Sequence, residues 1–281
     1  METKREQSER SFDEKKRAYF SALAASVLSA MRLHKRPGNL WERNKEGKRD
    51  WGNVSEHCLV EVARVGVLAE KLGLSEEVRQ NLKIAAGLHD FDKRSEILAM
   101  KEEIRRGGSG FDASNLSDEK AERFLRGAGF SENVIEIAGS VGGKSPKLFA
   151  IAELLKKEQL TDQDTARLVI HYVDGYTRGS DWTESVDRSG EEPINEVDRR
   201  VQKNKQNINY QKRDLESVAD YDGDLLLRGR GDIENDALIC HLAERRLVEI
   251  IAKTTGEKIE PLELPEIIDQ EIKKKIEGVQ P

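Results

Sequence analysis

Leu88-His89-Asp90-Phe91-Asp92-Lys93 closes an apolar run and is the stretch around which the rest of the sequence can be organised. Upstream of it, apolar residues recur from Val78 to Leu88 at helical spacing, which predicts an amphipathic helix capped by Ser75. Successive residues of a regular helix point about 100° apart, so His89 and Asp90 can converge on one partner only where the helix loosens at its end. The stretch therefore predicts a core helix that ends in a chemically active pair.

His57 upstream and Asp174 downstream extend this pair to a set of four, and each lies on a predicted helix. Two imidazoles and two carboxylates suit a divalent ion such as manganese, iron, cobalt or zinc, or a bridged pair of ions. An unpaired carboxylate on an apolar helix is costly, so Asp174 needs a partner. That partner is a metal or, as the structural alternative, one of three nearby side chains: Arg167, His171 or Arg178.

The composition favours an all-α fold. The chain has 281 residues, of which 37% are apolar and 36% charged, with 6 prolines and 5% aromatic residues. A β-sandwich would need more aromatic and β-branched residues than this. We therefore expect a helical bundle with solvated helix faces, large enough to bury a core.

Other features bear on location and partners. The two cysteines, Cys58 and Cys240, have no metal-finger spacing and are expected to be reduced. No long apolar run occurs, so we expect a cytoplasmic protein with no membrane partner. A net charge of -6 argues against binding to nucleic acid.

Apolar periodicity and capping residues divide the chain into predicted helices separated by polar loops. A frayed polar end is expected up to about residue 13. The predicted helices span residues 13–34, 53–72, 76–89, 97–104, 117–130, 131–139, 145–155, 162–176 and 233–253, with a loop and a short charged helix at 261–281.

The polar segment between the first two helices contains Trp41, Arg43, Arg49 and Trp51. Its tryptophans either anchor a loop or form a wall of the pocket, where an arginine fork could bind phosphate. We place Trp41, Arg43, Arg49 and Arg178 among the substrate-binding candidates.

Gly139-Ser140-Val141-Gly142-Gly143-Lys144-Ser145 is close to a phosphate-binding P-loop. The first glycine of that motif would have to be residue 138, which is alanine, and no strand precedes it. The stretch is better explained as a helix stop.

Residues 179–232 are polar and poor in periodicity, with a basic patch from Arg199 to Arg213. Acidic residues are interspersed in this region, so a solvated lobe or a homodimer arm is favoured over an RNA contact.

The order His57, His89-Asp90, Asp174 resembles the H…HD…D pattern of the HD-domain metal-dependent phosphohydrolases. Asn53-Val54-Ser55-Glu56-His57 is similar to the opening motif of their 5′-deoxynucleotidase branch. The resemblance implies an HD-domain core over residues 51–180. An N-terminal helix and Trp/Arg loop (1–50) precede this core, and a polar lobe with a C-terminal helix that packs on the core (181–281) follows it.

The resemblance also implies a function. A divalent metal (manganese, cobalt, iron, magnesium or zinc) on His57, His89, Asp90 and Asp174 would activate water to hydrolyse a phosphate ester, with a nucleotide as the expected substrate. Lys93 would offset phosphate charge, or else pair with Asp92 or Glu96. Glu56 or Asp92 would orient the water or protonate the leaving oxygen.

Two points separate this chain from the known branches. Asp92-Lys93 stands where the deoxynucleotidase branch has a glutamate, and it matches instead the HDxxK form of the cyclic dinucleotide phosphodiesterases. The further histidines of that second branch have no match around residues 139–144, so a single metal is favoured. The alternative function is a non-catalytic HD module that binds a nucleotide or a protein partner.

Overall fold

Every regular element in the described part of the chain is a helix. The computed structural model describes residues 4–34, 53–93, 98–99, 102–103, 105–107, 111–177, 196–206 and 208–279. No strand occurs in these ranges, which confirms the all-α prediction. None of the helices in the same ranges combines the length and the apolar character needed to cross a bilayer.

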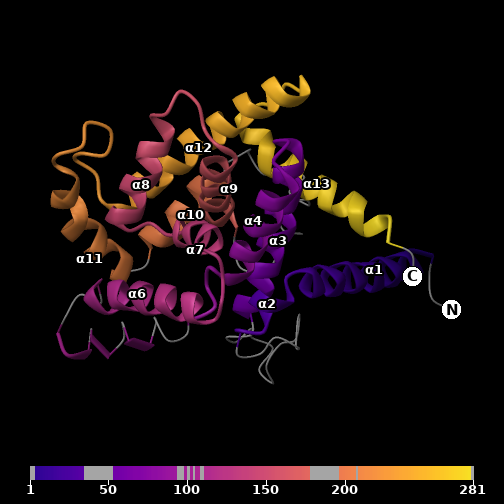
Figure 1. Cartoon of the computed structure of the whole chain (residues 1–281), viewed down its shortest axis with the longest axis horizontal. Coiled ribbons are helices and arrows are strands. Elements are labelled where there is room, and N and C mark those ends of the chain that lie inside the picture. The colour runs from indigo at the N-terminus through magenta and orange to yellow at the C-terminus, as the bar shows by residue number, and fades with distance from the viewer. Residues whose placement is uncertain are drawn as a thin grey trace.

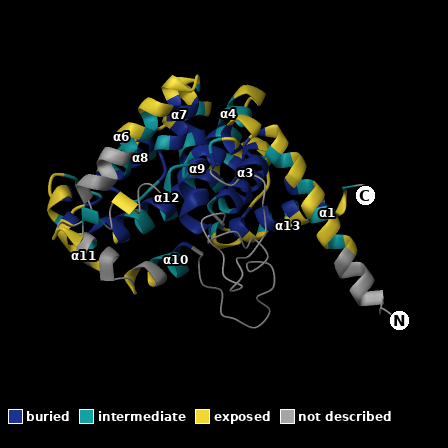
Figure 2. Ribbon diagram, turned by 90° about the horizontal axis from the view of Figure 1, so that it is seen from below, coloured by how far each residue is buried: buried dark blue, intermediate teal, exposed yellow. Residues whose placement is uncertain are grey.

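Three mutually packed helices form the centre: α3 (Asn53–Lys71), α4 (Glu76–Leu88) and α9 (Asp162–Tyr176). Both α3 and α9 are apolar around most of their circumference, so they are buried on several sides (Figure 2). Gly73 ends α3 in the left-handed region, with φ of 69°, which allows the chain to turn back into α4.

A second set of helices surrounds this centre (Figure 1). On one side α7 (Glu132–Gly139) packs against α4 and α9, and α6 (Phe111–Gly127) packs on α7. On another side α12 (Asp232–Thr255) packs against α9, α8 (Ser145–Leu155) and α10 (Glu196–Lys205). The chain that follows α9 thus returns, as α10 and α12, to pack against α9.

The two ends of the chain pair with each other. Helix α13 (Leu264–Glu277), which follows the short 3₁₀ helix η2 (Pro261–Glu263), packs against α1 (Lys4–Ser26) and α3. The start of α1 and the end of α13 lie at the same end of the molecule (Figure 1). The buried Arg64 of α3 donates hydrogen bonds of 2.9 and 2.8 Å to the carboxylate of Asp269 on α13. This ion pair ties the last helix to the central one.

Several predicted helix starts are confirmed. Ser131 caps α7 by accepting a hydrogen bond from the backbone N–H of Val134. Thr161 and Asp164 form a reciprocal capping box at the start of α9. Ser75 occupies the N-cap position of α4, although its side chain makes no capping hydrogen bond.

The helix expected over residues 13–34 differs in both its start and its continuity. It begins at Lys4 rather than near residue 13, and it is interrupted at Val27, before the short helix α2 (Leu28–Met31). The charged residues at its start are good helix formers, so the helix extends beyond its apolar stripe. Ser117, expected as a cap, lies inside α6.

The polar region after α9 also contains helices that apolar periodicity does not predict: α10, α11 (Ile208–Ser217) and the 3₁₀ helix η1 (Val218–Tyr221). Polar helix formers such as Glu, Arg, Gln and Lys sustain a helix without a wide apolar stripe. Val197 is one of the few apolar residues of α10, and it is buried. The helix expected over residues 97–104 falls partly outside the described residues.

Candidate metal centre

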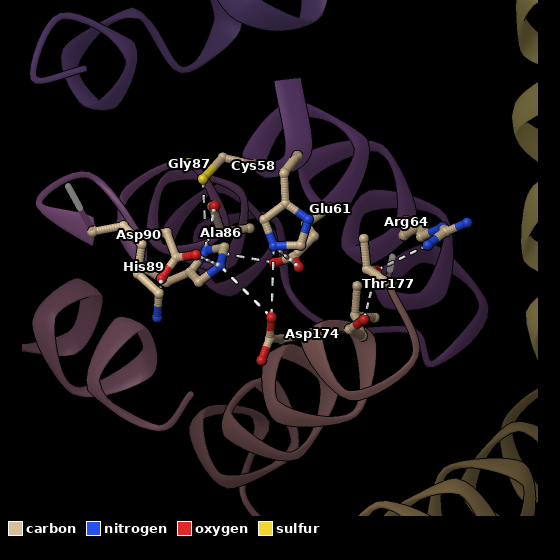
Figure 3. A network of polar contacts seen from close by, with 12 residues as sticks. Cys58, Glu61, Arg64, Ala86, Gly87, His89, Asp90, Asp174 and Thr177 are labelled. Atoms are coloured by element: carbon tan, nitrogen blue, oxygen red, sulfur yellow. Dashed lines mark hydrogen bonds and ion pairs between the residues drawn. The ribbon is translucent and has the colours of Figure 1, made fainter. Parts of the chain in front are cut away.

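Four potential metal ligands from three helices converge at the centre of the bundle. Helix α3 carries His57 and Glu61, one turn apart, while His89 follows the last residue of α4 and Asp174 belongs to α9. One donor atom from each residue lies within 4.8 Å of each of the others, so the group could hold a metal ion. Figure 3 shows Asp174 pointing from α9 towards His89 and Glu61 on the facing helices.

The imidazole of His89 is oriented by the backbone of its own helix. Its Nδ1 lies 2.9 Å from the carbonyl oxygen of Ala86, and a carbonyl can only accept, so Nδ1 carries the proton and donates. In the neutral ring Nε2 therefore offers a lone pair. This atom is buried and has no hydrogen-bond partner among the described residues. A metal ligand commonly has its second nitrogen held in this way.

Glu61 is the residue of this group that the sequence analysis missed. It is fully buried, and neither of its carboxylate oxygens has a hydrogen-bond partner in the described part of the chain. Its Oε1 lies 3.0 Å from Nε2 of His57, and its Oε2 lies 3.4 Å from Nδ1 of His89. Its position in the sequence is the signal: a carboxylate inside an apolar run, four residues after a histidine and thus on the same helix face.

The two oxygens of Asp174 face different partners. Oδ1 lies 3.6 Å from Nε2 of His57 and 3.9 Å from Nε2 of His89, whereas Oδ2 accepts a hydrogen bond of 3.2 Å from Nη2 of Arg200. Arg200, on α10, was not among the arginines considered as partners from the sequence. Arg167 instead pairs with Glu136 at 2.8 Å. Asp174 thus has a cationic neighbour and still presents one oxygen to the imidazoles.

The electrostatics of the group reflect these close charges. Burial lowers the pKa of His57, but the charges of Glu61 and Asp174 outweigh burial and raise it well above its usual value. Burial raises the pKa of Asp174, but Arg200 and the two imidazoles hold it well below its usual value. Groups of opposite charge therefore lie close together in a largely buried setting.

Asp90 lies beside the group of four rather than within it. Its Oδ2 is 3.8 Å from Nε2 of His89, and its Oδ1 is 3.4 Å from Nζ of Lys93. Burial opposes ionisation of Asp90, but Lys93, His89 and His57 lower its pKa to about 2. The carboxylate is thus ionised and adjacent to the free nitrogen of His89, as a further oxygen ligand would have to be.

None of the three predicted catalytic residues, Glu56, Asp92 and Lys93, belongs to the group of four potential ligands. Lys93 is ion-paired with Asp90 at 3.4 Å, while Glu96, one of the two acidic residues weighed from the sequence, lies outside the described residues. Glu56 is buried in the first turn of α3, and Asp92 is half-buried in the turn after α4.

The substrate-binding candidates lie outside the described residues. These residues are Trp41, Arg43, Arg49 and Arg178. Their proposed contacts with a phosphate ester therefore stay predictions. Arg200 is the arginine that the structure does place at the group, and its Nη1 is buried with no hydrogen-bond partner among the described residues.

The residues present fit a divalent cation. Nitrogen and oxygen donors converge from His57, His89, Glu61 and Asp174, and the buried Nε2 of His89 and both oxygens of Glu61 lack hydrogen bonds within the described ranges. Buried polar atoms of this kind are costly unless something binds them. A shared cation would bind all of them at once.

No protein-family model, no curated protein and no solved structure matches this chain. The support for a metal ion in this chain is therefore the geometry of these side chains and their order along the sequence.

Proposed function

We propose that this chain is a metal-dependent phosphohydrolase of the HD type that cleaves a phosphate ester, with nucleotide phosphomonoesters as the expected substrate class. The observation that carries the proposal is the convergence of His57, His89 and Asp174 from three helices, in the order of the H…HD…D pattern. The buried Glu61 strengthens it, because its carboxylate lies beside both imidazoles, at 3.0 Å from His57 and 3.4 Å from His89, where a shared ligand would lie.

The donor set indicates which ions suit the site. Two imidazoles with carboxylates favour manganese, iron, cobalt or zinc over magnesium, which prefers oxygen ligands and retains water. When bound, such a cation supplies Lewis acidity, which lowers the pKa of water and polarises a phosphoryl oxygen.

The surrounding side chains supply the remaining functions. Ala86 fixes the ring of His89, and Arg200 fixes the carboxylate of Asp174. Nη1 of Arg200 has no hydrogen-bond partner among the described residues, and a guanidinium suits phosphate binding because its planar fork matches phosphate geometry. Lys93 adds a second positive charge at the end of α4.

Proton transfer is assigned to a carboxylate next to the ligands. Glu56 immediately precedes His57, and Asp92 follows the His89-Asp90 pair by two residues. Either residue could orient the attacking water or protonate the leaving oxygen. Replacing each in turn by its amide, with substrates of different leaving-group basicity, separates the two roles.

The test is a hydrolysis screen with the full chain. Chelator-treated protein is assayed on nucleoside monophosphates, cyclic nucleotides and a simple aryl phosphate, with manganese, cobalt, iron, magnesium and zinc supplied separately. We expect metal-dependent phosphate release by the unmodified chain and by Asp222→Ala, a matched change of an exposed aspartate, and no release by Asp174→Ala.

Two outcomes would overturn the proposal. Stoichiometric metal binding without turnover of any substrate would favour the non-catalytic binding module. Undiminished turnover by Asp174→Ala would show that the chemistry occurs elsewhere. Circular dichroism of Asp174→Ala establishes that a loss of activity is not a loss of fold.

A further inference from the structure

A second group of potential ligands lies on the other side of α9. His171, one turn before Asp174, faces Asp236 and Cys240 of α12. One donor atom from each of the three residues lies within 4.8 Å of each of the others. His171 and Cys240 are almost fully buried, and Asp236 is partly buried.

His171 is oriented in the same way as His89. Its Nδ1 lies 3.0 Å from the carbonyl oxygen of Ser140, so Nδ1 carries the proton and donates. Its Nε2 is buried, has no hydrogen-bond partner among the described residues, and lies 3.5 Å from Oδ1 of Asp236. In the neutral ring this nitrogen carries the lone pair, and the thiol of Cys240 belongs to the same close group.

Two glycines bring the surrounding backbone close to this group. A methyl group at Gly175 would collide with Sγ of Cys240, and a Cβ at Gly143 would lie 3.1 Å from Cγ of Asp236. The glycine-rich stretch at residues 139–145 that resembles a P-loop is thus part of the wall here. The carbonyl oxygen of Ser140 in this stretch accepts the hydrogen bond from His171, and the backbone at Gly143 lies close to the side chain of Asp236.

We propose that His171, Asp236 and Cys240 form a second metal site, distinct from the first and selective for zinc-like ions. An imidazole, a carboxylate and a thiolate are all zinc ligands, and three protein ligands leave one position of a tetrahedral ion open. The thiolate makes this site softer than the first group, whose donors are only nitrogen and oxygen. This inference does not depend on the proposed phosphohydrolase activity.

The charge balance around the site is compatible with a bound ion. A thiolate and a carboxylate together contribute two negative charges, which neutralise a divalent cation. Arg200, ion-paired with Asp174, is near enough to interact with Asp236 and Cys240 as well. A neutral metal centre beside this guanidinium avoids the repulsion that an uncompensated cation would meet.

The chain offers a direct test because it has only two cysteines. In Cys58→Ala, any metal–thiolate bond must come from Cys240. The reduced, chelator-treated full-length variant is titrated with cobalt(II), a spectroscopic substitute for zinc. We expect a thiolate-to-cobalt charge-transfer band in the near ultraviolet that is saturated once two equivalents are bound, because the first group can also bind cobalt. With zinc, X-ray absorption should then show one sulfur at about 2.3 Å.

Control variants locate the band. Glu61→Gln, combined with Cys58→Ala, alters the first site and should leave the band in place. His171→Gln in the same background should weaken cobalt binding at the thiolate by more than about 10-fold, the lower end of what ligand-supporting residues contribute. These comparisons do not require a Cys240 variant that might fail to fold.

The absence of a charge-transfer band in folded Cys58→Ala at saturating cobalt would overturn the proposal. It would leave His171 and Asp236 as two neighbouring polar side chains beside a thiol. A band that is unaffected by His171→Gln would overturn the assignment of His171 as a ligand. Neither result bears on the hydrolysis screen, so the two proposals can fail separately.

Discussion

Glu61 lies one turn after His57 on α3, and its Oε1 lies 3.0 Å from Nε2 of that imidazole. Its Oε2 lies 3.4 Å from Nδ1 of His89, so the carboxylate stands between two imidazoles, where a ligand of a shared cation would lie. We predict that Glu61→Gln lowers the affinity of the centre for manganese by more than about 10-fold, because even residues that only support ligands contribute that much. Isothermal titration calorimetry of the full chain measures it.

Glu244→Gln is the matched control for this prediction. Glu244 is equally buried, but it accepts a hydrogen bond of 2.7 Å from the hydroxyl of Tyr172 and is not part of the group. Manganese affinity should be unchanged in this variant. Equal affinities for Glu61→Gln and the unmodified chain would exclude Glu61 as a ligand.

Arg200 should affect substrate binding more than turnover. Loss of a charge-assisted hydrogen bond costs roughly 1.5–3 kcal/mol, so Arg200→Ala should lower kcat/KM by roughly 10- to 100-fold, mainly through KM. Arg200→Lys keeps the charge but loses the planar fork, and should recover part of the loss. An unchanged KM in Arg200→Ala would mean that this side chain only positions Asp174.

The Arg64–Asp269 pair should contribute strongly to stability. Both side chains are buried, and Arg64 also donates a hydrogen bond of 2.9 Å to Thr177 and lies over the ring of Tyr176. Removing one partner leaves an uncompensated buried charge, so Asp269→Asn should cost about 3–5 kcal/mol. Urea denaturation measures this. Arg64→Met combined with Asp269→Leu should cost less than Asp269→Asn alone. If the double variant instead lost the sum of the free energies lost by Arg64→Met and Asp269→Leu separately, the two side chains would not be directly coupled.

The approach of Gly175 to Cys240 predicts a second coupled pair. An added methyl group at Gly175 would collide with Sγ of Cys240, so Gly175→Ala should destabilise the chain by about 1–3 kcal/mol, as overpacking typically does. Cys240→Ala removes the sulfur and should relieve most of this cost in the double variant. Purely additive changes in the unfolding free energy would show that α9 and α12 separate to accommodate the methyl group.

His34 should make the fold sensitive to acid. Its Nε2 donates to the carbonyl oxygen of Gly87 at 2.8 Å, and burial lowers its pKa below the usual 6.5. Because the unfolded chain then binds a proton more readily than the folded one, the contribution of His34 is complete above pH 6.5 and declines as the pH falls below it. Gln in place of His34 keeps a donor but does not titrate, so the loss of stability below pH 6.5 should become shallower.

His241 should act in the opposite direction. Glu244 and Asp198 raise its pKa, so it stabilises the folded chain when protonated and loses that contribution as the pH rises through its folded pKa. His241→Gln should therefore remove stability at low pH and change little at high pH. Thermal melts of both histidine variants across this range check the two signs, and the same slope change in both would contradict the assignment.

The helical class, several helix starts and three of the four residues in the central group could be predicted from the amino-acid sequence alone. Apolar spacing and the capping at Ser131 and Thr161 depend on residues a few positions apart, so they can be read along the chain. His57, His89 and Asp174 were recognisable because each is a polar residue placed on or at the end of an apolar helix, where an unpaired group would be costly.

The partners of the buried charges, in contrast, depend on how the helices pack in three dimensions. Glu61 could have paired with several cations, and Asp174 pairs with Arg200, which lies 26 residues away on a helix with few apolar residues. Similarly, the contact of Asp269 with Arg64 spans 205 residues. Helix periodicity is a local property, whereas the partner of a buried charge depends on which helices the chain reversals bring together.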